Sequence, residues 1–176
     1  MGRDKATLPV GDVPLIEHLA RRLSPVVDEI IVAGGGDPLL PDVRLVPDRF
    51  PGMGPLAGMH AGFLQARHDL VWVVACDLPD VAPALGPFML DLAQDFDAVV
   101  PRPDSEPQGV CAFYRRELAA RIEALLMASK PSVKQLLAIS NVRYVGYAEL
   151  KAVDPQLRSF RNLNTPADYE AWLRTR

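Results

Sequence analysis

The chain has 176 residues, of which 49% are hydrophobic and 23% charged, and its formal net charge is −3. This length and composition are typical of one globular domain and exclude disordered and fibrous proteins. The chain has no apolar run of 18 residues and no N-terminal signal peptide, so we expect neither a membrane nor a secreted protein. The 19 basic residues are scattered, which argues against a nucleic-acid partner. Two cysteines fit a reducing compartment, and the cytoplasm is the expected location.

Helix-like and strand-like segments alternate along the chain. Helical spacing of apolar residues falls at 13–23, 56–66, 83–94, 115–129 and 132–139, and a last helix begins at 166. Strand-like runs fall at 28–33, 44–46, 70–76, 97–101, 108–114, 142–147 and 157–163. With short connections between them, these segments predict an α/β fold: a three-layer sandwich with a mostly parallel, Rossmann-like sheet, as a single domain over residues 1–176.

The run LVWVVAC at 70–76 is apolar without alternation, which predicts a strand buried on both faces. Asp77 follows this run directly. Ligands of open α/β sheets bind outside the carboxyl ends of the strands, so the Asp77 carboxylate is a candidate to hold Mg²⁺ with a substrate phosphate. The alternative is an aspartate that only caps the next turn, helped by Pro79.

The loop PDRFPGMGPLAG at 47–58 is rich in glycine and proline. Its glycines permit a ligand to approach the backbone, and the helix that begins near Pro55 offers free N–H groups to an anion. It matches neither GxGxxG nor the Walker pattern. The alternative is a turn-rich loop with proline at the first helical position.

The remaining polar candidates are less informative by themselves. Lys5 alone is typical of a solvated lysine. Thr165 and Pro166 predict a helix start, which leaves the preceding Asn162 and Asn164 open to a ligand role. The three histidines and two cysteines are expected to be packing or surface residues: His18, His60, His68, Cys76 and Cys111. The chain also lacks the GxSxG motif that surrounds the nucleophile of a hydrolase.

Four short segments read together resemble a known family. MGRDK at 1–5 resembles the end of LAGGxSxRMGxDK, the signature of nucleotidyltransferases with a Rossmann-like sheet. GPLAG at 54–58, CDLP at 76–79 and NLNTP at 162–166 are similar, in order and spacing, to segments of the molybdenum cofactor guanylyltransferase family. The resemblance spans residues 1–168 and implies a fold of the nucleotide-diphospho-sugar transferase type.

The resemblance implies that GTP and molybdopterin, with or without molybdenum, react to give the guanine dinucleotide cofactor and pyrophosphate. It implies that Lys5 stabilises the triphosphate and that Asp77 binds Mg²⁺, both as catalytic residues that also contact the nucleotide. The remaining implied site residues are Asp48, Gly54 and Gly58 on the nucleotide side, and Asn162 and Asn164 on the pterin side. The implied partners are these small molecules, with transient contact to other cofactor-synthesis proteins or molybdoenzyme chaperones.

Two departures from the family pattern leave alternatives open. The LAGG loop and the strand before it are missing from residues 1–176, so we expect this chain by itself to be poorly active, because the loop supplies a cradle of backbone donors. The asparagine often found after the second strand is replaced by Ala33-Gly34-Gly35. The choice between guanine and cytosine as the base of the nucleotide substrate therefore stays open. The alternatives are a molybdopterin cytidylyltransferase or related small-phosphate nucleotidyltransferase, and a catalytically inactive chain that binds nucleotide or a partner.

Overall fold

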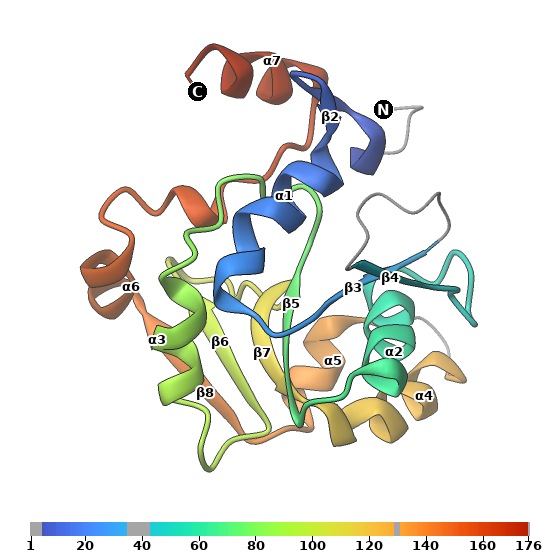
Figure 1. The fold of residues 1–176 in the computed structure, drawn as a ribbon. Coiled ribbons are helices and arrows are strands. Elements are labelled where there is room, and N and C mark those ends of the chain that lie inside the picture. The colour runs from blue at the N-terminus through green and yellow to red at the C-terminus, as the bar shows by residue number, and fades with distance from the viewer. Residues whose placement is uncertain (1–4, 35–42, 129–130, 176) are drawn as a thin grey trace.

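The computed structural model describes residues 5–34, 43–128 and 131–175, and it has an α/β architecture (Figure 1). The strands are β1 (Pro9–Val10), β2 (Val13–Pro14), β3 (Ile30–Ala33), β4 (Val43–Val46), β5 (Leu70–Val74), β6 (Ala98–Arg102), β7 (Cys111–Arg115) and β8 (Val142–Gly146). The α-helices are α1 (Leu15–Leu23), α2 (Pro55–Gln65), α3 (Leu85–Asp91), α4 (Ala119–Leu126), α5 (Val133–Ala138), α6 (Tyr147–Val153) and α7 (Pro166–Arg174). Short 3-10 helices are η1 (Lys5–Thr7), η2 (Ser24–Val26), η3 (Arg116–Leu118) and η4 (Arg158–Phe160).

The main sheet has four strands in the order β5-β7-β6-β8. Strand β7 is antiparallel to β5 and β6, and β6 pairs in parallel with β8, so β5, β6 and β8 run in one direction. A separate parallel pair joins β3 to β4, and β1 and β2 form a small antiparallel hairpin. The predicted α/β class is confirmed, with a sheet that is mixed because β7 runs against its neighbours.

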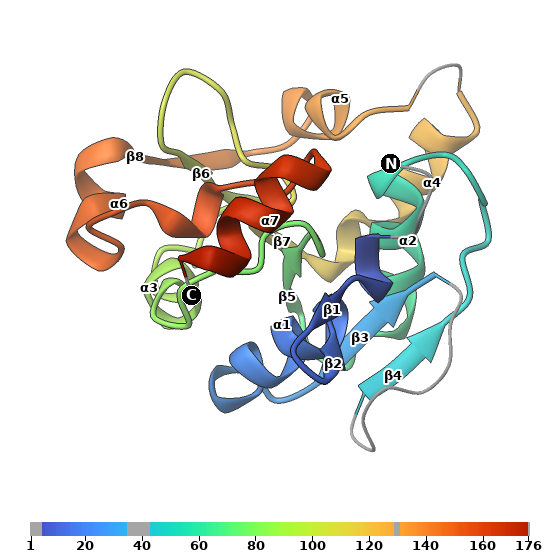
Figure 2. The same cartoon turned by 90° about the horizontal axis from the view of Figure 1, so that it is seen from above.

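The strands carry apolar residues on both faces, and helices cover both. Val100 and Tyr114 pack with residues of α2, α4 and α5, whereas Val99 and Phe113 pack with α3 and α6. Because successive strand residues point to opposite faces, these two sets define the two sides of the sheet. Seen from above, α3 and α6 lie on one side of β5 and β7, and α2 and α4 lie on the other (Figure 2). The expected three-layer arrangement is confirmed.

Strand β5 is less buried than its sequence predicts. All five residues of β5 are only partly buried, whereas the first four residues of β6 and of β7 are buried. Strand β5 pairs with β7 along one edge, and none of the described strands pairs with its other edge. Val71 and Val73 nevertheless pack against the core on one face of the sheet, and Leu70 and Trp72 pack on the other, so the predicted strand with two apolar faces is confirmed and its partial exposure is at the edge.

The prediction of a strand at 157–163 is wrong. Leu157 takes a left-handed conformation with φ of 50°, and η4 follows it. The buried Asp154 carboxylate accepts hydrogen bonds from the Ser159 backbone N–H (2.8 Å) and hydroxyl (2.7 Å), which folds the segment back on itself. Helix α6 and the β1–β2 hairpin were not predicted.

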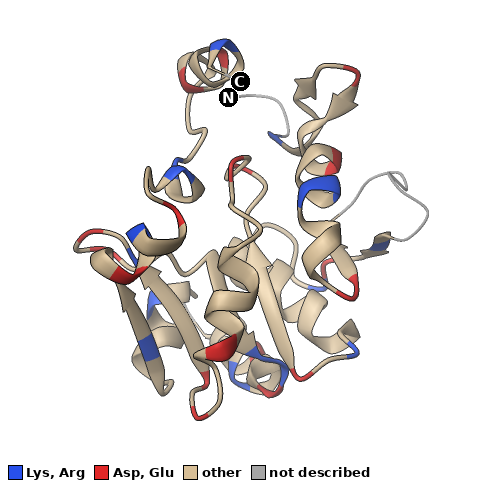
Figure 3. Ribbon diagram, turned by 60° about the vertical axis from the view of Figure 1, so that its left-hand side comes forward, with Lys and Arg blue, Asp and Glu red and all other residues tan. Residues whose placement is uncertain are grey.

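Charged residues lie mainly in helices, loops and the ends of strands (Figure 3). The middle of the sheet is mostly uncharged in the same view. Across the described part of the chain, no helix has the length and apolarity that crossing a bilayer requires.

Candidate active site

Three side chains that are far apart in the sequence meet at the carboxyl end of β5. Lys5 Nζ donates to Asp77 Oδ2 at 3.0 Å and to Asn164 Oδ1 at 3.3 Å. Lys5 lies in η1, Asp77 follows the end of β5, and Asn164 comes just before α7. The structure therefore brings one cation, one carboxylate and one amide together at the sheet edge where α/β proteins bind ligands.

The ion pair between Lys5 and Asp77 is accessible from outside. The two side chains are 29% and 22% exposed. A charged pair at such a site is partly shielded from water yet open to a ligand. Phosphate oxygens and a metal ion are suited to it, because the ammonium attracts the former and the carboxylate the latter.

The segment with Asn162 and Asn164 is tied to the strand that carries Asp77. The Leu163 backbone N–H donates to the Asp77 carbonyl oxygen at 2.9 Å. Asn162 and Asn164 both line the cavity that Asp77 lines. The two asparagines and the aspartate thus share one wall, although only Asn164 has a hydrogen bond to Lys5 among the contacts of the described residues.

A capping box fixes the start of α7 immediately after Asn164. Thr165 Oγ1 accepts from the Asp168 backbone N–H at 3.1 Å, and Asp168 Oδ2 accepts from the backbone N–H of Thr165 and of Asn164 at 2.8 and 3.1 Å. Hydrogen bonds from Thr165 and, more weakly, from Asn164 hold the pKa of Asp168 below its ordinary value. The predicted helix start is confirmed. The positioning of Asn164 by Asp168 was missed, although the cap spacing was its signal.

Two glycines shape the loop that leads into α2. Gly54 has φ of 74° and ψ of −162°, a conformation that other residues rarely adopt, and Pro55 takes the first helical turn after it. Gly58 lies in α2 against the end of β3, where an added Cβ would make an ordinary contact with the Cβ of Ala33 at 3.4 Å. Pro55 and Gly58 line the same cavity as Asp77.

Asp48 lies in the same loop but apart from the Lys5–Asp77 pair. Its Oδ1 accepts from the Phe50 backbone N–H at 2.8 Å, which is an Asx turn. Asp48 is not among the described residues that line the cavity with Asp77. Its described hydrogen bond stabilises the loop, and a nucleotide contact stays a prediction.

The cavity has a volume of about 1230 Å³. Asp77, Asn162 and Asn164 line one end, and the cavity continues between β3 and β5 along the whole of both strands. Among the described residues, no three His, Cys, Asp or Glu side chains cluster as a metal site. A divalent ion at Asp77 would therefore be coordinated by one protein carboxylate, and its remaining ligands would be phosphate oxygens and water, as is usual for Mg²⁺.

The histidines and cysteines lie where the sequence predicts packing or surface positions. His60 is fully buried with its ring against Phe50, and His18 packs edge-on to Trp172. Cys111 is buried in β7, and burial raises the pKa of its thiol to about 12. A buried neutral thiol of this kind is not a nucleophile.

An α/β sheet with a Lys–Asp pair and an asparagine at its carboxyl edge, beside a glycine-proline helix start, defines a nucleotide-binding class of protein. The family described as "MobA-like NTP transferase domain" matches residues 1–144. The chain belongs to this MobA-like NTP transferase family and is a nucleotidyltransferase. The family resemblance of the four sequence motifs is thereby confirmed, although residues 1–4 of the first motif lie outside the described residues.

Two relatives show how far the likeness extends. The chain is 36% identical over 170 residues to a probable molybdenum cofactor guanylyltransferase of Pelotomaculum thermopropionicum, covering 96% of this chain and 83% of the relative. It is 31% identical over 178 residues to a protein of the same description from Carboxydothermus hydrogenoformans, covering 99% of this chain and 89% of the relative.

Solved structures share the fold. Molybdopterin-guanine dinucleotide biosynthesis protein A from Archaeoglobus fulgidus has a TM-score of 0.83 at 22% identity, over 99% of this chain and 91% of its own. 2-C-methyl-D-erythritol 4-phosphate cytidylyltransferase from Thermus thermophilus has a TM-score of 0.69 at 22% identity, over 97% and 93%. Rv0371C of Mycobacterium tuberculosis, solved in complex with manganese, has a TM-score of 0.70 at 20% identity, over 98% and 93%.

Proposed function

We propose that the chain transfers GMP from GTP to molybdopterin, giving the guanine dinucleotide cofactor and pyrophosphate. In this reaction a terminal phosphate oxygen of the pterin bonds to the α-phosphorus of GTP, and the bond from that phosphorus to the β-phosphate oxygen breaks. The relatives named molybdenum cofactor guanylyltransferase support the choice of substrates. The observation that carries the proposal is the meeting of Lys5, Asp77 and Asn164 at the carboxyl end of β5.

The donor set at Asp77 fits a magnesium ion that is shared with a nucleotide. Asp77 is a partly exposed carboxylate without a second acidic or imidazole ligand in a described cluster, which matches an ion held mainly by phosphates. When bound, Mg²⁺ supplies charge neutralisation at the transferring phosphoryl group. Asp77 would hold it, and Lys5, 3.0 Å from Asp77, would neutralise neighbouring phosphate oxygens.

The two sides of the cavity suit the two substrates. On the nucleotide side, Pro55 and Gly58 of α2 line the cavity, and the free N–H groups at the start of this helix, which follows Gly54, favour phosphate. Asp48 in the same loop would contact the nucleoside. On the other side, Asn162 and Asn164 would donate and accept hydrogen bonds with the pterin, because amides match its mixed donor and acceptor edges.

Cytidylyl transfer is the second candidate function, because the end of β3 offers little to distinguish guanine from cytosine. Strand β3 ends in Ala33 and Gly34 follows it, and neither residue carries a side chain that hydrogen-bonds a base. Contacts with the base at this strand end would come from the backbone alone. A cytidylyltransferase of another phosphate substrate shares the fold.

The proposal is tested by incubating the purified chain with molybdopterin, Mg²⁺ and either GTP or CTP labelled at the α-phosphate. Formation of a labelled guanine dinucleotide and unlabelled pyrophosphate is the expected result. The same assay on the chain extended upstream by its in-frame codons examines whether residues 1–176 suffice. Preference for CTP would support the second candidate. Nucleotide binding without transfer in both forms would support the non-catalytic alternative. We also propose, from the same chemistry, contact with proteins that deliver molybdopterin or receive the dinucleotide.

A further inference from the structure

The carboxyl edge of the main sheet continues from β5 to β7 and β6, beyond the cavity that Asp77 lines. The Ala75 backbone N–H, just after β5, donates to the Val110 carbonyl oxygen, just before β7, at 2.8 Å. Val110 lines the cavity together with Asp77. Helix α7 lies beyond this edge (Figure 1), and in the view from above it crosses over β6 and β7 (Figure 2). A substrate at Asp77 that extends past Val110 therefore meets the start of β7 and the end of β6.

The turn that leads into β7 is fixed by hydrogen bonds and by packing. The Gln108 backbone N–H donates to the Pro101 carbonyl oxygen of β6 at 2.8 Å, and the buried Tyr114 hydroxyl donates to the Gly109 carbonyl oxygen at 2.6 Å. A Cβ at Gly109 would lie 2.5 Å from Cγ1 of Val133, so only glycine fits between this turn and α5. The partly buried Gln108 side chain makes no hydrogen bond with the residues that the structure describes. Its amide is therefore available to a ligand from a backbone that is already in place.

Arg102 is the last residue of β6 and lies at the same edge. It is two residues from Val100, so it shares the face of the sheet that α2 and α5 cover. The central carbon of its guanidinium lies 5.2 Å from the centroid of the Tyr144 ring on β8. Arginine stacks on aromatic faces in this way, and the stacking holds the planar group in one orientation. Because Arg102 is exposed, the side of the guanidinium away from Tyr144 is accessible to a ligand.

The charge of Arg102 is not neutralised by a carboxylate in the described part of the chain, although two acidic residues follow it closely. One of these, Asp104, accepts the Glu106 backbone N–H at 2.8 Å and so stabilises its own loop. Arg121, by contrast, pairs with Asp97 just ahead of β6, at 2.8 Å. The edge that begins at Asp77 thus ends in a cation that is oriented by an aromatic ring and has no acidic partner among these residues.

We propose that Arg102 and Gln108 bind the ring system of the acceptor substrate and determine its specificity. The class of ligand is an anion with a planar nitrogen heterocycle at the end remote from its reacting phosphate. Molybdopterin belongs to this class, and for the identity of the acceptor the inference rests on the proposed function. The guanidinium stacks on the flat ring from the side opposite Tyr144, and the Gln108 amide donates and accepts hydrogen bonds at the edge of the ring.

The spacing of the strands suits an acceptor whose two ends are bound separately. Neighbouring strands lie about 4.8 Å apart, and β7 is the one strand between β5 and β6, so the ends of β5 and β6 are about 10 Å apart. The reacting phosphate lies at the Lys5–Asp77 pair, and the ring lies across the start of β7 towards Arg102. Binding energy from the ring then positions the phosphate for attack, which is how remote contacts select a substrate.

The binding probe is 6-carboxypterin, a fluorescent pterin anion that has no phosphate to react. We expect the purified chain to bind it one to one and to quench its emission in a saturable way. Arg102→Gln should weaken binding about ten-fold, because the charge and the stacking are both lost. Gln108→Ala should also weaken it, because the amide that bonds the ring edge is removed.

Two further variants separate this role from a general loss of charge. Arg121→Gln removes the same charge from the arginine that pairs with Asp97 and should leave binding unchanged. Arg102→Lys keeps the charge without the planar group and should bind more weakly than wild type. Absence of binding by the wild type, equal binding by Arg102→Gln, or full binding by Arg102→Lys would overturn the inference.

Kinetics distinguish a failure of this inference from a failure of the proposed function. In a background that transfers GMP, Arg102→Gln should raise the KM for molybdopterin about ten-fold and leave the KM for GTP unchanged. Transfer with neither KM changed, or with only the KM for GTP raised, refutes the role of Arg102 and leaves the proposed function standing. Pterin binding that depends on Arg102, in a chain that transfers no nucleotide, supports the ring site and refutes the proposed function alone.

Discussion

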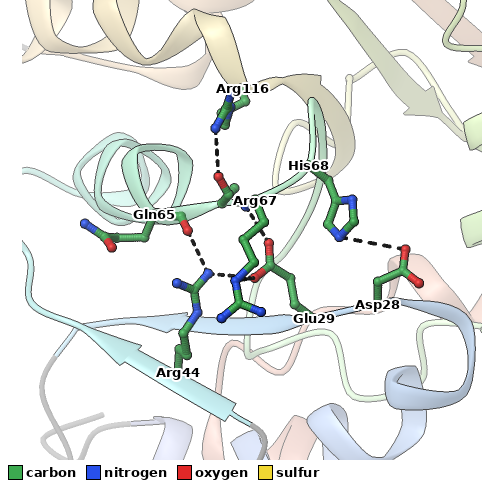
Figure 4. A network of polar contacts seen from close by, with 8 residues as sticks. Asp28, Glu29, Arg44, Gln65, Arg67, His68 and Arg116 are labelled. Atoms are coloured by element: carbon green, nitrogen blue, oxygen red, sulfur yellow. Dashed lines mark hydrogen bonds and ion pairs between the residues drawn. The ribbon is translucent and has the colours of Figure 1, made fainter.

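The carboxylate of Glu29, just ahead of β3, accepts the backbone N–H of Arg67, just ahead of β5, at 2.7 Å. Arg44 Nη2 of β4 lies 2.6 Å from the other oxygen of Glu29 and also donates to the Gln65 carbonyl oxygen at 2.6 Å. The paired side chains of Glu29 and Arg44 thus connect the β3–β4 pair to the beginning of β5 and to α2 (Figure 4). Because Glu29 is only 16% exposed, these bonds are partly shielded from water.

Glu29→Gln should destabilise the chain by about 1–3 kcal/mol at pH 7, because a charge-assisted network is lost. Partial burial acts to raise the pKa of Glu29, but the Arg67 hydrogen bond and the charges of Arg44 and Arg67 outweigh it and lower the pKa. A lowered pKa stabilises the fold above the unfolded-state value of about 4.3, and this stability is lost as the pH falls through the folded-state value. Urea unfolding of wild type and variant should therefore converge at acid pH. A difference that is constant from pH 7 to pH 3 would contradict the charge-based account.

Asp77→Asn should lower nucleotidyl transfer by ~10²-fold or more, because it removes the main charged contact proposed for the metal at the transferring phosphoryl group. The turnover number in saturating GTP and Mg²⁺ is the measurement, made in a background that turns over GTP. Asp69→Asn at the other end of β5 is the matched control, since Asp69 is 85% exposed. Wild-type turnover of Asp77→Asn would remove Asp77 from the site.

Asp48 and Asn164 should act on different substrates. Asp48→Ala is expected to raise the KM for GTP, and Asn164→Ala the KM for molybdopterin. Asp48→Asn separates contact from loop structure, because the amide oxygen can still accept the Phe50 N–H. If Asp48→Asn restores the wild-type KM, Asp48 acts only through the turn. If both alanine variants change the KM of one substrate, the division of the cavity is incorrect.

The two cysteines should differ in reactivity. Cys111 is buried, and burial raises the pKa of its thiol to about 12, so it stays protonated at pH 8, whereas Cys76 is partly exposed beside Asp77. One equivalent of iodoacetamide should react with the native chain at pH 8, and Cys76→Ser should abolish that reaction. Mass spectrometry measures the stoichiometry, and GTP with Mg²⁺ should slow the labelling. Labelling of Cys111 in the native state would contradict its burial.

Two glycines of the α2 segment should respond to alanine in opposite directions. Gly54→Ala should cost about 1–3 kcal/mol, because the φ and ψ of Gly54 lie in a region almost restricted to glycine. Gly62→Ala should stabilise the chain by up to about 1 kcal/mol, because Gly62 lies inside a helix with space for a Cβ. Chemical denaturation measures both. A neutral Gly54→Ala would show that the loop has another accessible conformation.

Elements with strong periodicity were predictable from the sequence. The continuous apolar run before Asp77 gave a strand, and the spacing of Leu56, Met59 and Phe63 gave a helix with these residues inward. The segment at 157–163 was not predictable in this way, because the bonds from Ser159 to Asp154 override its apolar pattern. The hairpin of β1 and β2 was missed because each strand has two residues, too few for a period to be visible.

The candidate site was predictable only in part. Lys5 by itself has the pattern of a solvated lysine, and only the family motifs placed it with Asp77 and Asn164. The separations of 72 and 159 residues carry no local signal that would bring these side chains together. The Asx turn of Asp48 agrees with the turn-rich loop predicted at 47–58, and the capping box at Thr165 agrees with the predicted helix start.

The separation of the β3–β4 pair from the four-stranded sheet affects which part of the protein unfolds first. Strands β6 and β7 lie within the four-stranded sheet and are buried, whereas β3 has one paired neighbour among the described strands and no buried residue. Segments of this kind unfold with a smaller free energy than the rest of a protein and exchange their amide hydrogens earlier. We therefore expect the amide hydrogens of the β3–β4 pair to exchange before those of β6 and β7, so that the β3 side of the cavity opens more readily than the middle of the four-stranded sheet.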